Sequence, residues 1–196
     1  MGNVVANLAD RAVADRHGTY AAEIRALLDA ALAVMRRDNT VDPKVADIVR
    51  ESGLSNQAFY RHFDGKDALL LTLLTDGRER LAGTIDRRME RAQSPEARVR
   101  AWINAVLDQA RDPAAAAATR PFVANADRLA VTHPEAVARS REQLLAPLAA
   151  TVGSENAVAI YHLAMGVMHD ALGAARTPSK RETDAVTEFA IRGCRT

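Results

Sequence analysis

Apolar residues recur at intervals of three and four along almost the whole chain, and this spacing constrains the fold more than any other feature. Such spacing gathers apolar side chains on one face of a helix, whereas a half-buried strand would need an apolar residue at every second position. No convincing stretch of two-residue alternation bounded by turn residues occurs. The sequence therefore predicts an all-α protein of about nine helices.

Capping residues and prolines divide the chain into these helices. A long helix is predicted over residues 19–37, and Asp42-Pro43 predicts a short one to about Arg50, with the proline at its first position. Further helices are predicted over 66–91, 95–111, from 113 onward, after a capping box at 132–135, over 155–176, and after a capping box at 179–182. Pro121 is expected to bend or break its helix near Arg120, and Pro147 to kink the next.

Composition narrows the class of protein. A chain of 196 residues is long enough for one domain of ordinary size or two small ones. No apolar run approaches the roughly 18 residues that a membrane span needs, so a soluble protein with no membrane partner is expected. The one cysteine, Cys194, excludes an intrachain disulfide, and residues 1–6 lack the pattern of a secretory signal. We therefore expect a cytoplasmic location.

The segment 43–63 holds two short helical patterns joined by Glu51-Ser52-Gly53-Leu54, a turn too tight for an ordinary helical hairpin. Gly53 can adopt a positive φ and end the first helix. Ser55 then caps the second helix with its hydroxyl. A glycine that ends one short helix, followed two residues later by a serine that caps the next, is typical of a helix-turn-helix.

A helical wheel at about 100° per residue separates the side chains of the second short helix into two faces. One face can pack against the first helix and holds Ala58, Phe59, His62 and Phe63. The other face presents Asn56, Gln57, Tyr60 and Arg61 outward. Amide, phenol and guanidinium groups can bond base edges and phosphates in a major groove. A merely solvated helix face would look the same, so this segment alone leaves both interpretations open.

The stretch from Val45 to Leu70 resembles the DNA-binding signature of the TetR family of bacterial transcriptional regulators. The resemblance rests on a shared pattern of glycine, serine, Tyr-x-His-Phe, lysine and leucine, at Gly53, Ser55, Tyr60, His62, Phe63, Lys66 and Leu69. It covers this stretch and the preceding helix, while the C-terminal two-thirds matches only in length and helicity. The sequence departs from the usual pattern at Asn39, Pro43, Val49 and Ser52, none of which lies on the outward face.

The resemblance implies a helix-turn-helix DNA-binding domain over residues 1–66 and a helical effector-binding and dimerisation domain over residues 67–196. It implies a sequence-specific regulator of transcription, a repressor released by a small hydrophobic effector, with a palindromic double-stranded DNA operator as partner. The residues implied to contact bases or phosphates are Lys44, Ser55, Asn56, Gln57, Tyr60, Arg61, His62 and Lys66.

Charge gives a constraint on this interpretation. Residues 1–66 hold nine basic and nine acidic side chains, so the predicted DNA-binding domain has no net charge. DNA affinity would then depend on where each charge lies. We therefore expect the acidic side chains to lie away from the DNA-facing surface, and the affinity to fall with salt as it does for only a few phosphate contacts per subunit.

The segment 155–176 is apolar nearly all round, so one subunit would not cover it completely. His162, Gly166, His169 and Gly173 form one stripe of it, and the two glycines permit close helix approach. TetR-like proteins pair their last two helices with those of a second subunit, so segments 155–176 and 179–194 are predicted to form a homodimer bundle. The alternative is that both helices complete a monomeric core.

The effector pocket is an expectation from the resemblance. Candidate lining residues are Trp102, Phe122, Asn125, Met165 and His169, each of which also suits a plain core position. His162 and His169 are separated by about 10 Å of helix rise, too far for one metal ion. The sequence contains no HExxH, GxSxG or phosphate-binding glycine loop, so no catalytic residue, enzyme activity, metal or cofactor is expected. The competing hypothesis is a helical small-molecule-binding or scaffold protein with a non-functional helix-turn-helix.

Overall fold

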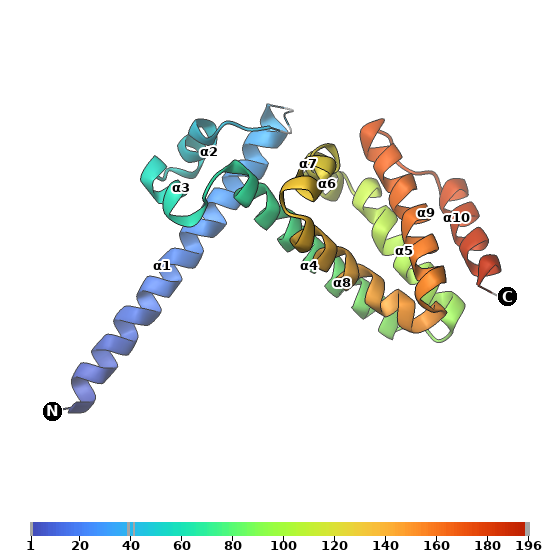
Figure 1. The fold of residues 1–196 in the computed structure, drawn as a ribbon, viewed down its shortest axis with the longest axis horizontal. Helices are drawn as coiled ribbons and strands as arrows, with labels where there is room; N and C mark the ends of the chain where they lie inside the picture. The colour runs from blue at the N-terminus through green and yellow to red at the C-terminus, as the bar shows by residue number, and fades with distance from the viewer. Residues whose placement is uncertain (1, 39, 41, 195–196) are drawn as a thin grey trace. The chain divides into compact units, whose positions relative to one another are not determined.

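A computed structural model of the chain describes residues 2–38, 40 and 42–194, with side chains from Gly18 onward. Over these residues the chain forms ten helices and no strand (Figure 1). The predicted all-α fold is confirmed, with one helix more than the approximate number. Two compact units, Met1–Leu69 and Leu70–Thr196, divide the chain. The assignment of DNA binding to residues 1–66 and of effector binding and dimerisation to 67–196 remains a prediction.

The first unit contains α1 (Gly2–Arg37), α2 (Val45–Ser52), α3 (Asn56–His62) and the beginning of α4 (Lys66–Glu90). Helices α2 and α3 pack against each other and against α1 (Figure 1). Helix α1 begins well before the predicted residue 19. Helix α2 begins at Val45 and not at Pro43, and its N-cap is Lys44. The carboxylate of Asp42 accepts a hydrogen bond from the ammonium of Lys66. Asn39, one of the departures from the family pattern, lies outside the described residues.

The turn between α2 and α3 has the predicted form. Gly53 has φ 70°, the left-handed conformation in which a side chain would be strained, and it ends α2. The hydroxyl of Ser55 accepts a hydrogen bond from the backbone N–H of Ala58 at 3.1 Å and so caps α3. Both predictions are confirmed. The turn fixes the direction in which α3 leaves α2.

A small apolar core holds α3 in place. Phe59 is fully buried, and its ring centroid lies 5.7 Å from that of Phe63. Ile48 of α2 and Leu27 of α1 are also fully buried in this first unit. Burial of aromatic and branched side chains on three helices makes the outer face of α3 a rigid surface.

The second unit contains most of α4 and then α5 (Pro95–Arg111), α6 (Pro113–Ala124), α7 (Ala126–Thr132), α8 (Pro134–Val152), α9 (Ser154–Gly173) and α10 (Lys180–Gly193). Helix α5 packs against α6, α8, α9 and α10 (Figure 1). Its Trp102 is fully buried and donates its indole N–H to the carbonyl of Leu144 at 2.9 Å. The polar atom of the largest core side chain is therefore satisfied inside the protein.

Pro121 and Pro147 lie inside helices that continue past them, so Pro121 does not break its helix, whereas a bend at Pro121 and a kink at Pro147 stay predictions. Helix α6 continues through the buried Pro121 to Ala124, and α8 continues through Pro147 to Val152. The carbonyl of Pro121 accepts a hydrogen bond from the side-chain amide of Asn125 at 2.8 Å, which helps the helix end there and adds the unpredicted α7. Packing of a helix on its neighbours outweighs the local cost of the proline.

The two predicted capping boxes had different outcomes. At 179–182, the hydroxyl of Ser179 and the carboxylate of Glu182 both make the reciprocal bonds that define the motif. At 132–135, His133 is the N-cap of α8 and its side chain makes no capping bond. The hydroxyl of Thr132 instead donates to the carbonyl of Arg128 at 2.9 Å, because Thr132 belongs to the last turn of α7.

Candidate nucleic-acid interface and effector region

The outer face of α3 is exposed as the helical wheel predicts. Ser55, Asn56, Gln57, Tyr60 and Arg61 are all exposed, whereas Ala58, Phe59 and Phe63 are buried. Tyr60 is 60% exposed, and its ring meets the edge of Phe59 at 5.2 Å between centroids. The amide, phenol and guanidinium groups thus share one surface that the buried rings support. Lys44, also exposed, is the N-cap of α2.

Glu23 of α1 holds two residues of α3. Its carboxylate accepts a hydrogen bond from the guanidinium of Arg61 at 2.6 Å and lies 2.5 Å from Nε2 of His62. The hydrogen bonds from His62 and Arg61 lower the pKa of the Glu23 carboxyl, so it stays ionised. The ion pair with Glu23 therefore links Arg61 of α3 to α1, while the arginine side chain stays exposed.

His62 differs from the other predicted DNA-contacting residues because its side chain is fully buried. Its ring packs edge-on against Tyr20 at 4.3 Å between centroids. Nε2 faces Glu23, and Nδ1 is buried and has no hydrogen-bond partner among the described residues. A phosphate contact by His62 stays a prediction, and it would require the ring to leave its place between α1 and α3.

Two acidic side chains contact predicted DNA-binding cations. Glu23 pairs with Arg61, and the carboxylate of Asp42 pairs with the ammonium of Lys66. The expectation that acidic residues lie away from the DNA-facing surface is wrong for these two. The partners are 38 and 24 positions apart, so no local sequence pattern indicates these pairs.

The five predicted effector-binding residues fall into two groups. Trp102 and Asn125 are buried, and each gives its polar N–H to a backbone carbonyl, which is how ordinary core residues behave. Phe122, Met165 and His169 are partly buried, and Met165 packs against the core of the second unit. The role of all five in ligand binding stays a prediction.

Arg78 of α4 is a polar residue of this region that the sequence analysis missed. Its guanidinium is partly buried and donates to the carbonyl of Val137 at 3.2 Å. Burial lowers the pKa of Arg78. Burial and the nearby charge of Arg78 lower the pKa of His169, which keeps that imidazole neutral. The sequence does indicate that Arg78 lies on the inner side of α4. It precedes the buried Leu81 and Ile85 by three and seven positions, a spacing that places all three on one helix face.

Tyr161 and Arg141 adjoin the same region. Tyr161 is 6% exposed, and its ring centroid lies 6.2 Å from that of Trp102. The guanidinium of Arg141 lies over the Tyr161 ring, 5.2 Å from its centroid, and also lies 3.1 Å from Nε2 of His162. Cation–π contact with a buried ring is a favourable place for an arginine.

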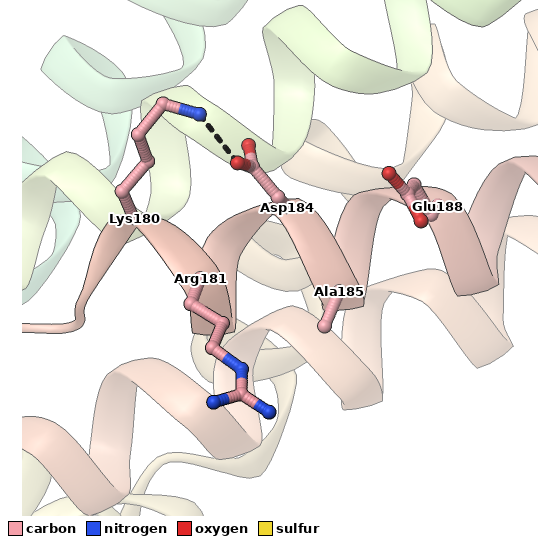
Figure 2. Close-up of a pocket in the computed structure, with 5 residues that line it drawn as sticks. All are labelled: Lys180, Arg181, Asp184, Ala185 and Glu188. Atoms are coloured by element: carbon pink, nitrogen blue, oxygen red, sulfur yellow. Dashed lines mark hydrogen bonds and ion pairs between the residues drawn. The ribbon is translucent and has the colours of Figure 1, made fainter.

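A surface hollow on α10 is a different kind of feature (Figure 2). It is lined by Lys180, Arg181, Asp184, Ala185 and Glu188. Lys180 and Asp184 form an ion pair, and Figure 2 shows Arg181 directed away from that pair. None of the predicted effector-binding residues lines this hollow. Its walls come from one helix, so it does not enclose an apolar ligand.

The described part of the chain contains neither a candidate membrane span nor a candidate metal site. No helix there is long and apolar enough to cross a membrane. No group of three or more histidine, cysteine, aspartate or glutamate side chains in that part is arranged to hold a metal ion.

Comparison with known proteins identifies the N-terminal segment. Residues 27–73, which include α2 and α3, match the family model of the bacterial regulatory proteins of the tetR family. The HTH-type transcriptional regulator BetI of Brucella canis is 30% identical over 79 residues, and its counterpart in Brucella melitensis biotype 1 is equally similar. The match spans 40% of this chain and 40% of the length of each of these relatives.

Solved structures extend the likeness to both units. A proposed transcriptional regulator from Streptomyces coelicolor matches with a TM-score of 0.71 over 89% of this chain and 99% of its own, at 16% identity. A TetR family transcription regulator from Marinobacter aquaeolei matches with a TM-score of 0.63 over 89% and 96%, at 15% identity. Identities this low show a shared fold alone. The segment 27–73 is therefore similar to the tetR family of bacterial regulatory proteins, and nearly the whole chain shares its fold with the solved regulators.

Proposed function

We propose that the protein is a sequence-specific DNA-binding regulator of transcription that places α3 in the major groove. The observation behind this proposal is the exposed face of α3, where Asn56, Gln57 and Tyr60 stand on a rigid support. Amides can bond adenine in pairs, and the phenol can reach phosphates. Lys44, Ser55, Arg61, His62 and Lys66 would add phosphate or base contacts around them.

A homodimer would supply two such surfaces. Val158 of α9 and Phe189 of α10 are 38% and 67% exposed, and Gly166 and Gly173 of α9 are also exposed. Large apolar side chains in water beside small residues suit close packing against the same helices of a second copy. A two-fold axis would place the α3 helices on half-sites about one DNA turn, roughly 34 Å, apart. The operator would then be palindromic.

We further propose that the protein is a cytoplasmic repressor that releases its operator when the second unit binds a small effector. The ligand would favour one of two states of the dimer that differ in the separation of their α3 helices. Trp102, Phe122, Asn125, Met165 and His169 remain the candidates from the sequence for the apolar part of that site.

Selection from random duplex DNA tests the main proposal. The full-length protein should enrich a two-fold symmetric site, and a variant with Asn56→Ala and Gln57→Ala should enrich none. Gln143→Ala, an exposed amide on α8, is the matched control and should enrich the same site as the original chain. Folded, dimeric protein that enriches no symmetric site would contradict the proposal.

Sedimentation tests the dimer. Phe189→Arg should give a monomer because it places a charge in the proposed apolar contact. Val131→Arg is the control, since Val131 of α7 is 82% exposed and lies outside the proposed contact. If Phe189→Arg and the original chain sediment alike, the bundle of α9 and α10 is not the interface.

A specific observation favours the alternative of a scaffold with a non-functional helix-turn-helix. Arg61, His62 and Lys66 all face carboxylates of the same chain, which leaves fewer cations for phosphates. The dependence of DNA affinity on salt separates the two hypotheses. A regulator should lose affinity with salt as a few phosphate contacts per subunit require, whereas a scaffold should show no measurable slope.

A further inference from the structure

The second unit contains a polar cluster whose cations have no carboxylate partner. We call it the Arg78 cluster and define it as Arg78 of α4, Arg141 of α8, and Tyr161 and His169 of α9. Arg78 donates to one backbone carbonyl, that of Val137. Within the described residues, no aspartate or glutamate forms an ion pair with Arg78 or Arg141.

Neighbouring arginines on α4 do have carboxylate partners. On the same helix, Arg80 pairs with Asp76, and Arg88 pairs with Asp108 of α5. Arg78 lies deeper than these two and has less compensation. A guanidinium has five N–H donors, and a single carbonyl at 3.2 Å uses one of them. Arg78 is only partly buried and bonds one carbonyl among the described residues, so most of its donors remain available to a partner that is not part of the protein.

The other members of the cluster add donors and no negative charge. The imidazole of His169 is kept neutral by burial and by the charge of Arg78. The Tyr161 phenol is an uncharged donor. Nε of Arg141 is buried and has no hydrogen-bond partner among the described residues. The region therefore has an excess of positive charge and of N–H and O–H donors.

Apolar side chains adjoin these donors. The Tyr161 ring lies beside the fully buried Trp102, and Met165 follows one helical turn after Tyr161 on α9. A ligand that satisfies both parts would carry one acidic group on an apolar body. A planar guanidinium recognises a carboxylate through two parallel hydrogen bonds, which gives both strength and orientation.

We propose that the Arg78 cluster binds the carboxylate of a small apolar organic acid, and that this acid is the effector of the proposed regulator. The inference deepens the proposed function, since it changes the expected effector from a neutral hydrophobic molecule to an organic anion. Arg78 bonds the carboxylate, Tyr161 donates to it, and the side chains near Trp102 cover the apolar body.

The test uses matched pairs of acids and neutral analogues on the full-length protein. The probes are benzoate and the straight-chain carboxylates of about six to twelve carbons, each beside its methyl ester, with phenyl phosphate as a separate arm. Binding is followed by the fluorescence of Trp102, the single tryptophan, and by the midpoint of thermal unfolding. At least one carboxylate should bind about tenfold or more tightly than its ester.

Variants assign the preference to the cluster. Arg78→Gln should lose the preference for the acid by about tenfold while its unfolding stays cooperative. Arg87→Gln, an exposed arginine on the same helix, is the matched control and should keep it. The inference is overturned if no carboxylate in the panel binds better than its ester, if phenyl phosphate alone is preferred, or if Arg78→Gln keeps the preference.

The result is separable from the proposed function, because ligand binding is measured without DNA. Loss of operator binding in all conditions would remove the regulator and leave an acid-binding site. Operator binding with no preference for acids would keep the regulator and remove this inference.

Discussion

Two arginines, one from each unit of the chain, differ in the partners that the protein gives them. In the first, Arg61 is mostly exposed and still has a carboxylate, Glu23, at 2.6 Å. In the second, Arg78 is partly buried, and the carbonyl of Val137 is its one hydrogen-bond partner among the residues that the structure describes. Water would have solvated the first cation without help, whereas the second needs a partner far more. The difference suggests that stability alone does not determine where the counter-charges lie.

Each unit has its own buried apolar side chains, and the largest expected effect tests whether the two units unfold separately. Phe59→Ala removes a fully buried ring from the first unit and should lower its free energy of unfolding by about 3–5 kcal/mol. Leu144→Ala should do the same to the second unit by about 2–5 kcal/mol. Calorimetry of both variants should show different transitions displaced. A single transition that both variants shift equally would mean that the units unfold together.

Replacing each arginine by methionine should give effects of opposite sign. Arg78→Met removes an uncompensated cation and should raise the free energy of unfolding by about 1 kcal/mol in the absence of ligand. Arg61→Met loses an ion pair near the surface and should lower it slightly. Denaturant unfolding of both variants measures the signs. A loss of stability in Arg78→Met would show that Arg78 is structural and would count against the acid-binding site.

Glu23→Gln tests what the internal carboxylate does to DNA affinity. Without the negative charge, Arg61 is free to bind a phosphate, and the plot of log affinity against log salt should steepen by about 0.9 per subunit. Affinity for unrelated DNA should rise at low salt. Glu142→Gln, an exposed carboxylate on α8, should change neither quantity. An unchanged slope in Glu23→Gln would mean that Arg61 does not compete between Glu23 and DNA.

The smallest effect concerns acid stability. The pKa of Glu23 is lowered in the folded protein, chiefly by the hydrogen bond from His62. A lowered carboxyl pKa contributes stability above the unfolded value of about 4.3, and the contribution disappears as pH falls through the folded value. The stability difference between the original chain and Glu23→Gln should therefore be present at pH 6 and shrink below about pH 4. A difference that stays constant with pH would exclude this linkage.

What the sequence predicted correctly depends on short-range chemistry. Gly53, Ser55 and the pair Ser179 and Glu182 act on backbone groups within four residues, so their roles follow from type and spacing. The division of α3 into inner and outer faces follows from helical periodicity in the same way. The similarity to the tetR family model also rests on this local segment.

What the sequence did not predict depends on distant partners. The ion pairs of Glu23 and Asp42 join residues 38 and 24 positions apart. The sequence therefore shows that the charges of this unit balance, but it does not show which charges pair. Pro121 stays inside α6 because tertiary packing outweighs a local preference. Arg78 was visible in the helical phase of α4, but only the structure shows that it has no carboxylate partner among the described residues.

In the proposed DNA-binding regulator, the pairs of Glu23 with Arg61 and of Asp42 with Lys66 would affect the search for the operator. Binding to unrelated DNA is almost entirely electrostatic, and a chromosome offers about 10⁶–10⁹ competing sites. A carboxylate that must be displaced before a cation can bind a phosphate lowers the affinity for every unrelated site equally. Contacts to base edges repay this cost only at the correct site. In that proposed regulator the internal acids would lower affinity in exchange for discrimination, and they would shorten the time that the protein spends bound to unrelated DNA.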